Sequence, residues 1–217
     1  MSLNEKIDVL KANTAKQAPA EALEVMHMAI ETLKNSGIME GILKTGDKIP
    51  QFELKSAEGV MVNSADILKN GPMILTFYRG AWWPYCNLEL EALQQAVDEI
   101  TALGATLVAV SPQIGKFNRA FIKKHQLNFD ILSDPGNTLS NKFGLTWDFP
   151  DDLRQVYTSF GIDLERFNSD GNWRLPMPAR YVVGQDSVIR STDVNPDHTI
   201  RLEPDETVEF LRNMMKG

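Results

Sequence analysis

Short apolar runs alternate with amphipathic stretches through the middle of the chain. The runs have the length of buried strands and are rich in Val, Ile, Leu and Phe. In the stretches between them, apolar residues recur every three or four positions, which predicts helices that each bury one face. Strands that alternate with such helices predict an α/β fold whose central strands are largely parallel. The strands are predicted at 73–78, 106–110 and 129–132, and the helices at 84–102 and 114–125.

The C-terminal part of the chain has a different order of elements. A helical segment is predicted near 151–164, and the polar, turn-rich stretch 161–176 is predicted to be a loop beside a crevice. The apolar runs at 180–183 and 187–190 are too close together for a crossover helix, so they should form an antiparallel hairpin. A last helix is predicted near 204–215. A β-α-β start followed by a β-β-α end is the topology of a thioredoxin-like domain.

The first forty residues have a helical pattern. Pro19 suits a first helical turn, and Leu23, Met26 and Ile30 then follow at a spacing of three or four. This apolar face must pack on something, so we expect either a cap on the domain or a dimer element. The sequence therefore predicts an N-terminal helical extension over 1–40 and a thioredoxin-like domain over 41–217.

Composition narrows the classes of partner. The chain has 217 residues, of which 43% are hydrophobic and 24% charged, as in globular proteins. Its net charge of −7 argues against binding to nucleic acid or to an anionic membrane surface. We find no apolar run of membrane-spanning length, and the first residues lack the apolar core of a signal peptide. A cytoplasmic location is the expectation.

The single cysteine, Cys86, is the candidate for chemistry. One thiol forms no intramolecular disulfide and is typical of a reducing compartment. Gly80 ends the strand at 73–78, and Pro84 suits the first turn of the next helix, which places Cys86 in that turn. Ligand crevices of α/β sheets open at such strand ends, and the positive helix end with its unpaired N–H groups stabilises a thiolate. Cys86 is therefore a candidate nucleophile, although most lone cysteines are inert core residues.

The segment FYRGAWWPYCNLELEAL at 77–93 resembles the FYRGxWCPYCNxEL segment of the alkyl hydroperoxide reductase/thiol-specific antioxidant (AhpC/TSA) family of peroxiredoxin-like proteins. TGDKIPQFEL at 45–54 resembles the first strand of that family. GNWRLPMPARYVV at 171–183 is similar to its LPxPAxYVI strand, and VNPDHTIRLEPDETVEFLR at 194–212 is similar to its DPDYxxRxEP tail. The resemblance covers nearly the whole chain and implies a central mixed sheet flanked by helices.

The resemblance implies a thiol-dependent peroxidase, with Cys86 at the position of the peroxidatic cysteine. Its thiolate attacks hydrogen peroxide or an organic hydroperoxide and becomes a sulfenic acid, with which a second thiol condenses. Because the chain has no other cysteine, this would be a one-Cys mechanism without a bound cofactor. The external thiol would come from thioredoxin, glutaredoxin or glutathione. Analogy with the family also implies a homodimer.

The sequence departs from the family pattern at two positions near the cysteine. Peroxiredoxins typically have Pro seven residues and Thr three residues before the reactive Cys, where this chain has Arg79 and Trp83. The similar subgroup often has a second Cys at the latter position. Trp83 offers neither a hydroxyl nor a thiol, although its indole N–H is able to donate one hydrogen bond and its bulk narrows the pocket.

An arginine is expected to support the thiolate and the peroxide. The resemblance makes Arg180 and Arg79 the two candidates. An alternative register of the PARYVV segment places Pro178 at the cis-proline that thioredoxin folds have beside the active cysteine.

Two further interpretations of the cysteine remain open. A lone thiol at a helix start is sufficient for monothiol exchange with glutathione mixed disulfides. The loss of both the Thr and the partner Cys is also compatible with a catalytically weakened scaffold that binds a partner or senses oxidation. The three histidines, His27, His125 and His198, show no metal-ligand spacing, and no metal site is expected.

Overall fold

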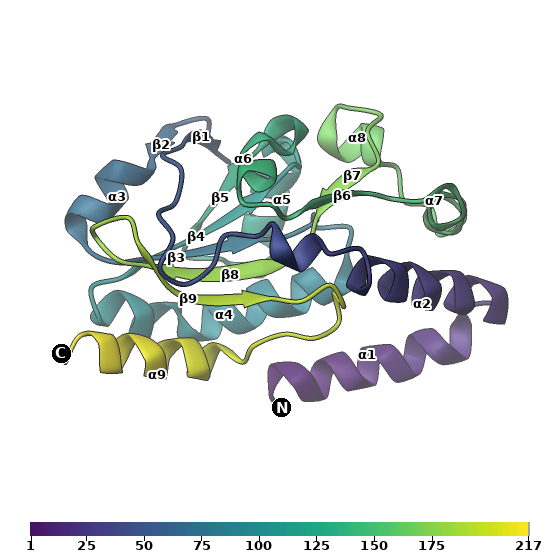
Figure 1. Cartoon of the computed structure of the whole chain (residues 1–217), viewed down its shortest axis with the longest axis horizontal. Coiled ribbons are helices and arrows are strands. Elements are labelled where there is room, and N and C mark those ends of the chain that lie inside the picture. Colours follow the sequence, from purple (N-terminus) through teal and green to yellow (C-terminus); the bar gives the residue numbers. More distant parts are fainter. Residues whose placement is uncertain (217) are drawn as a thin grey trace.

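A seven-stranded mixed sheet forms the centre of the computed structural model, which describes residues 1–216 (Figure 1). Gly217, the last residue of the predicted domain, lies outside the described residues. The strand order is β2-β1-β5-β4-β3-β8-β9, and β6 and β7 form a separate two-stranded sheet. The strands are β1 Glu53–Ser56, β2 Met61–Asn63, β3 Met73–Phe77, β4 Thr106–Ser111, β5 Asp130–Ser133, β6 Thr146–Asp148, β7 Arg174–Pro176, β8 Ala179–Val183 and β9 Ile189–Val194.

Helices cover both faces of the large sheet. In Figure 1, α4 and α9 lie below the sheet, and α3 and α6 lie above it. No helix within residues 1–216 is both long and apolar enough to cross a membrane. The α-helices are α1 Leu3–Gln17, α2 Ala20–Lys34, α3 Ser64–Asn70, α4 Pro84–Ala102, α5 Gly115–His125, α6 Thr138–Lys142, α7 Asp151–Ser159, α8 Leu164–Asn168 and α9 Pro204–Met214, with 3₁₀ turns at η1 Ile38–Glu40 and η2 Pro135–Asn137.

Strand pairing confirms the predicted fold class. β3 runs parallel to β4, and β4 runs parallel to β5. β8 pairs with β3 in the antiparallel direction and forms the expected antiparallel hairpin with β9. The predicted helix at 84–102 coincides with α4. The result is a mixed α/β sheet with a parallel centre and helical layers, as the sequence predicts.

The central strand β3 is buried on both faces, which explains its continuous apolar run. Met73, Leu75 and Phe77 point into the core on the side of α3 and α6, whereas Ile74 points into the core on the side of α4, α5 and α9. A strand enclosed in this way has a fixed register, because a slip by one residue would exchange its two faces. The carboxyl end of β3 thereby holds the start of α4 in one place.

The segment 161–176 is more ordered than predicted. It contains the short helix α8, which begins after Asp163, whose carboxylate accepts a hydrogen bond from the N–H of Arg166 at 3.0 Å. It also contains β7, which pairs with β6 so that Leu175 lies opposite Trp147. The pairing partner lies almost thirty residues away, so local polarity does not reveal it. The first strand also begins later than the resemblance at 45–54 implies, since β1 starts at Glu53.

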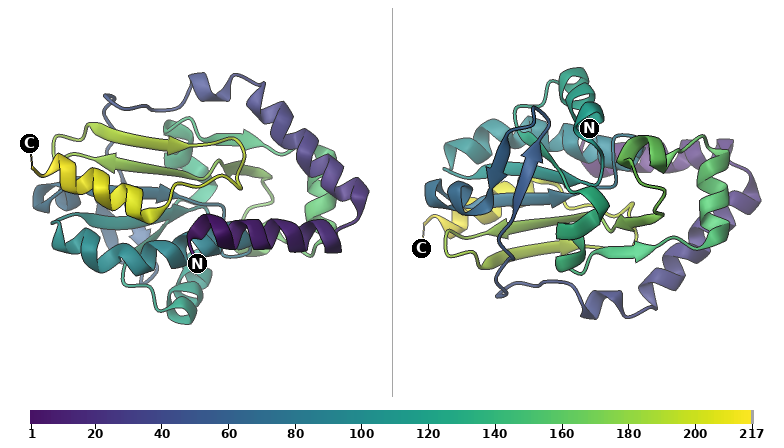
Figure 2. Two further views of the ribbon diagram at one scale, coloured as in Figure 1. Left: turned by 90° about the horizontal axis from the view of Figure 1, so that it is seen from below. Right: turned by 90° about the horizontal axis from the view of Figure 1, so that it is seen from above.

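The two N-terminal helices pack against helices of the sheet domain. α1 packs against α4, and α2 packs against α7 (Figure 2). A capping box between Ser2 and Glu5 starts α1. The carboxylate of Glu203, at the start of α9, accepts hydrogen bonds from the N–H groups of Leu3 at 3.1 Å and Asn4 at 2.8 Å. The helices therefore cap the domain, while the boundary at residue 40 and a role in dimerisation stay predictions.

Candidate active site

A tight loop joins β3 to α4 and presents Cys86. Gly80 has a φ of +149°, and a Cβ at this position would lie 2.3 Å from Nε1 of Trp82. Only glycine fits there without displacing the indole. Pro84 occupies the first turn of α4, and Cys86 is the third residue of that helix, as the sequence predicts. The loop is further held by Gln113, whose side-chain oxygen accepts from the N–H of Ala81 at 3.0 Å.

The amide of Cys86 does not hold the sulfur as expected. Its N–H donates to the carbonyl oxygen of Trp83 at 3.0 Å, because the first turn of the helix is tight. The positive end of α4 still favours a negative charge on the sulfur. Within residues 1–216, the hydrogen-bond donor to Sγ is a guanidinium instead.

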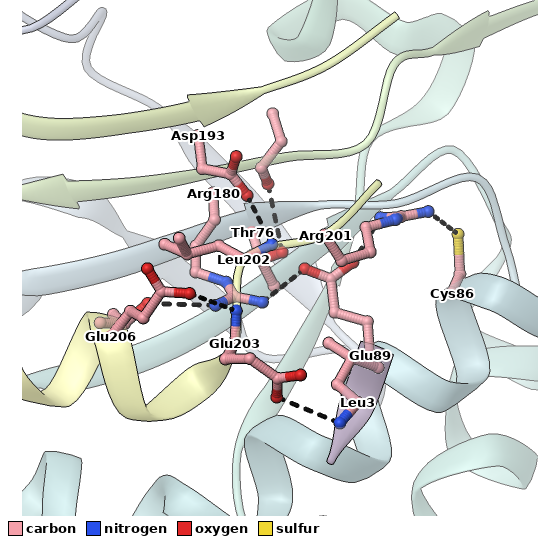
Figure 3. Close-up of polar contacts among 12 residues, drawn as sticks. Leu3, Thr76, Cys86, Glu89, Arg180, Asp193, Arg201, Leu202, Glu203 and Glu206 are labelled. Carbon is pink, nitrogen blue, oxygen red and sulfur yellow. Dashed lines mark hydrogen bonds and ion pairs between the residues drawn. The ribbon is translucent and has the colours of Figure 1, made fainter. Parts of the chain in front are cut away.

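That guanidinium belongs to Arg201, in the segment between β9 and α9. Nη2 of Arg201 donates to Sγ of Cys86 at 3.7 Å (Figure 3), and Nε donates to the carbonyl oxygen of His198 at 2.9 Å. Nη1 forms an ion pair with Glu89. Burial acts to lower the pKa of Arg201, but the negative charges of Glu89 and Cys86 outweigh it and raise the pKa. Arg201 is therefore a permanent cation beside the sulfur.

Glu89 joins two buried arginines. It lies three residues after Cys86 on α4, and its second oxygen is 2.7 Å from Nη2 of Arg180 on β8. Nη1 of Arg180 donates to the hydroxyl of Thr207 at 3.0 Å. Figure 3 shows the Glu89 carboxylate between Arg180 and Arg201, with Cys86 on the far side of Arg201. Arg180 thus reaches the sulfur only through Glu89 and Arg201.

Neither of the two predicted arginines forms a hydrogen bond to the sulfur, and the prediction of a cis-proline is wrong. The guanidinium of Arg180 binds Glu89 and Thr207 instead of Cys86. Arg79 has no hydrogen bond to the sulfur either; it is directed at the carbonyl oxygen of Pro176 and the hydroxyl of Tyr157, each at 3.5 Å. No peptide bond within the described residues is cis, so Pro178 is not a cis-proline.

Arg79 is a buried cation without a carboxylate partner in the part of the chain that the structure describes. Its guanidinium lies 5.6 Å from the ring centre of Trp83 and 5.3 Å from that of Phe149. Burial lowers the pKa of Arg79, while the charge of Cys86 acts to raise it. An uncompensated buried charge is costly, so an anion on Cys86 stabilises Arg79 as well.

Trp83 closes the site. Its ring is 4% exposed, stacks on Tyr157 at 5.0 Å between ring centres and contacts His198 edge-on at 5.0 Å. Nε1 of Trp83 has no hydrogen-bond partner within residues 1–216. The Cys86 side chain is fully buried. A peroxide therefore reaches the sulfur only after the aromatic side chains or the helical cap move.

A small apolar cavity lies on the outer side of this aromatic cluster. It has a volume of 220 Å³, and Trp83 forms part of its wall, whereas Cys86 does not. Residues of α1, α2 and the segment after α7 close it from the other side. The cavity is lined by Leu10, Thr14, Met26, Trp82, Trp83, Pro84, Tyr85, Phe160 and Ile162.

His198 gives the site a pH-dependent stability. Its ring is 4% exposed, and burial lowers its pKa well below 6.5, followed by the charges of Arg79, Arg201 and Lys11. Folding therefore requires the neutral ring. The unfolded chain binds a proton below about pH 6.5, so the stability that His198 contributes is complete above this pH and is lost as the pH falls toward the folded-state pKa.

We expect His198→Gln to flatten this dependence. Between pH 6.5 and 5.5, the wild type should lose up to about 1 kcal/mol of unfolding free energy more than the variant does. Urea unfolding of both proteins at several pH values measures the difference. Parallel curves for the two proteins would show that His198 is not titrating.

Metal ligands do not gather in the described residues. Within residues 1–216 no three His, Cys, Asp or Glu side chains lie close enough together to hold a metal ion. His125 is 2.8 Å from the carboxylate of Glu91 on the neighbouring helix. His27 lies on α2, far along the chain from His198.

Sequence reasoning missed Arg201, Glu89 and Tyr157. A signal existed for the first two. Arg201 stands inside the VNPDHTIRLEP segment that carries the family resemblance, and Glu89 lies at i+3 from Cys86, on the same helix face. For Tyr157 the chain offers no local signal, because α7 is brought to the site by tertiary packing.

The fold and the site together define a class: a thiol protein with a mixed α/β sheet, whose buried cysteine follows the central strand and is bound by an arginine. A model of the family described as "AhpC/TSA family" matches residues 45–192. The chain therefore belongs to the AhpC/TSA family, and the resemblance seen in its motifs is confirmed.

Relatives and solved structures agree with this assignment. The chain is 28% identical to the chloroplastic peroxiredoxin Q of Sedum lineare over 185 residues, 84% of each chain. It is 30% identical to the chloroplastic peroxiredoxin Q of Triticum aestivum over 143 residues, 65% of each chain, so it spans just under two thirds of that protein. The structure of peroxidoxin BcpB from Mycobacterium tuberculosis superposes with a TM-score of 0.62 at 20% identity, covering 79% of this chain and 98% of the other.

A yeast mitochondrial 1-Cys peroxiredoxin also shares the fold, with a TM-score of 0.62 and 15% identity, covering 81% of this chain and 78% of that one. At such identities the structures show the thioredoxin-like fold alone. The named peroxiredoxin relatives support a peroxidase of the oxidoreductase class.

Proposed function

We propose that this protein is a one-Cys thiol peroxidase in which Cys86 is the nucleophile. The observation that carries the proposal is the guanidinium of Arg201, whose Nη2 lies 3.7 Å from the sulfur at the start of α4. A cation and a helix N-terminus acting on one thiol favour the thiolate, which is the form that attacks peroxides.

The reaction transfers one oxygen atom to the sulfur. The thiolate attacks the terminal oxygen of hydrogen peroxide or an organic hydroperoxide, so the S–O bond forms as the O–O bond breaks. The sulfur is oxidised to sulfenic acid. The remaining oxygen leaves with the bonding electron pair and takes up a proton to become water or an alcohol.

Reduction then needs a thiol from another molecule. Cys86 is the only cysteine of the chain, so no resolving thiol exists within it. An external thiol from thioredoxin, glutaredoxin or glutathione condenses with the sulfenic acid, forming a mixed disulfide and releasing water. A second thiol displaces this disulfide and restores Cys86. A cytoplasmic location, where such thiols are kept reduced, is part of the proposal.

The experiment treats the reduced protein with one equivalent of hydrogen peroxide in the presence of dimedone. Mass spectrometry of the intact protein and of its peptides should find a single adduct on Cys86. Stopped-flow fluorescence of the tryptophans beside it gives the bimolecular rate. A rate no faster than that of free cysteine thiolate would refute the peroxidase.

One observation favours a second candidate. The sulfur is fully enclosed. This is expected of a protein whose thiol peroxides no longer reach, or of one whose thiol exchanges with disulfides only after the side chains around it move. If a glutathionylated peptide is turned over faster than peroxide, monothiol exchange is the function. If neither reacts, the protein is a binding or sensing scaffold.

A further inference from the structure

The phenol of Tyr157 has a proton without an acceptor. Tyr157 lies on α7 and is 1% exposed. Its oxygen accepts a hydrogen bond from Nη1 of Arg79 at 3.5 Å. Among residues 1–216 no group accepts the O–H proton in return. Buried hydroxyl groups normally use their donor, so this one is available to a molecule that enters the site.

Three aromatic contacts fix the ring of Tyr157 in the cluster around Trp83, at the start of α4. Trp83, three residues before Cys86, stacks on it at 5.0 Å with 23° between the planes. Phe149 contacts it edge-on at 5.4 Å, and Trp82 does so at 6.4 Å. Arg79 thus holds the hydroxyl oxygen, and the neighbouring aromatic side chains hold the ring. A hydrogen-bond donor fixed in this way needs little reorganisation during a reaction.

Tyr157 stays protonated over the working pH range. Burial raises its pKa to about 12, and the charge of Cys86 adds to this rise, while the cation of Arg79 opposes it. A negative charge on Cys86 acts to raise the pKa of both Tyr157 and Arg79, so ionisation of the sulfur and the protonation of this pair are coupled. Arg79 is also a buried cation whose charge no carboxylate in the described residues balances.

We propose that Tyr157, held by Arg79, binds the peroxide and donates its O–H to the oxygen that leaves when Cys86 attacks. This inference rests on the proposed peroxidase function. As the S–O bond forms and the O–O bond breaks, the leaving oxygen takes the phenol proton. The phenolate is stabilised by the guanidinium of Arg79, and water returns the proton afterwards. Tyr157 is then a catalytic residue, and Arg79 positions it.

Trp83, which precedes Cys86 by three residues, is another donor without a partner within residues 1–216, but it is less suited to this role. An indole N–H donates a hydrogen bond without releasing its proton, and no cation binds its nitrogen. Tyr157 combines an acidic proton with an adjacent cation. The aromatic stack with Trp83 then serves to hold the phenol in place.

The test compares two reactions of the same thiolate in Tyr157→Phe. Attack on hydrogen peroxide leaves an oxygen anion that needs a proton, whereas attack on iodoacetamide leaves iodide, which needs none. The variant keeps the ring and removes only the O–H. We expect the second-order rate with peroxide to fall about 10- to 100-fold. The alkylation rate at the same pH should stay within about threefold of wild type, since neither the helix start nor Arg201 is changed.

Tyr181→Phe is the matched control. Tyr181 is a buried tyrosine of β8 whose hydroxyl has no hydrogen-bond partner within residues 1–216, and its ring packs against Phe77 and Phe143 in the opposite core layer. Both rates should match those of wild type. Arg79→Lys provides a second measurement: it keeps the charge but removes the planar group that holds the phenol, so the peroxide rate should fall more than the alkylation rate.

The outcomes separate this inference from the function on which it rests. A fast wild type with an unchanged Tyr157→Phe variant overturns the role of Tyr157 and leaves the peroxidase standing. Equal losses in both reactions also overturn it, because Tyr157 would then act on the thiolate or on the fold. A wild type that reacts with peroxide no faster than free cysteine refutes the peroxidase itself.

Discussion

Replacing Cys86 by serine is expected to reduce peroxide turnover with dithiothreitol as reductant to the rate of the reductant alone. The hydroxyl of serine is not ionised near neutral pH, even with Arg201 beside it, and a neutral alcohol does not attack an O–O bond. No other thiol is present to take over, because the chain has one cysteine. The loss should therefore be complete rather than partial.

The fold should survive this substitution. Serine accepts the hydrogen bond from Arg201 that the sulfur accepts now, and it fits the volume of the cysteine. We expect the free energy of unfolding to change by less than about 2 kcal/mol, which urea unfolding measures. Turnover in Cys86→Ser above one tenth of the wild-type rate would mean that the peroxide is reduced elsewhere in the protein.

The elements that carry the cysteine were predictable because their signals are local. The apolar run of β3, the proline at the start of α4 and the spacing of its buried residues are all contained in thirty residues of sequence. These signals place Cys86 in the first turn of a helix, where the structure has it. Tertiary packing leaves the positions of this strand and helix as the local signals predict them.

The partners of the sulfur were predicted less well because they come from distant segments. Arg201 follows Cys86 by more than a hundred residues, and the packing of α9 against α4 brings it to the site. Arg180 and Arg79 were the expected arginines, yet each is directed elsewhere by a neighbour that the pattern does not show: Glu89 for Arg180 and Tyr157 for Arg79. The aromatic cluster around Trp83 likewise includes Tyr157 and His198 from distant segments.

Charge balance connects these separate contacts. Arg79, Arg180 and Arg201 are three buried guanidinium groups, and Glu89 is the carboxylate that two of them share. Burial, above all, raises the pKa of Asp193, which weakens it as a further counter-charge. A thiolate on Cys86 thus supplies negative charge that the cluster otherwise lacks. Ionisation of the sulfur therefore stabilises the charges of Arg201 and Arg79, whose pKa values it acts to raise.

Removing the Glu89 charge should therefore cost more than any surface substitution. In Glu89→Gln, Arg180 and Arg201 lose their shared counter-charge in a site where all three side chains are at most 3% exposed. We expect the free energy of unfolding to fall by about 3–5 kcal/mol, as when one partner of a buried ion pair is removed. Urea unfolding measures this loss.

Glu91→Gln is the matched control for this substitution, because it makes the same change on the same helix at a carboxylate near the surface. Glu91 is 38% exposed and pairs with His125 at 2.8 Å, so its loss should cost less than about 1 kcal/mol. Similar costs for the two variants would show that the arginines do not depend on Glu89. Glu89→Gln also leaves positive charge uncompensated beside the sulfur, which favours the thiolate, so alkylation of Cys86 near neutral pH should become faster in that variant but not in Glu91→Gln. A faster thiol together with a weakened fold would tie the reactivity of Cys86 to the same carboxylate that stabilises the core.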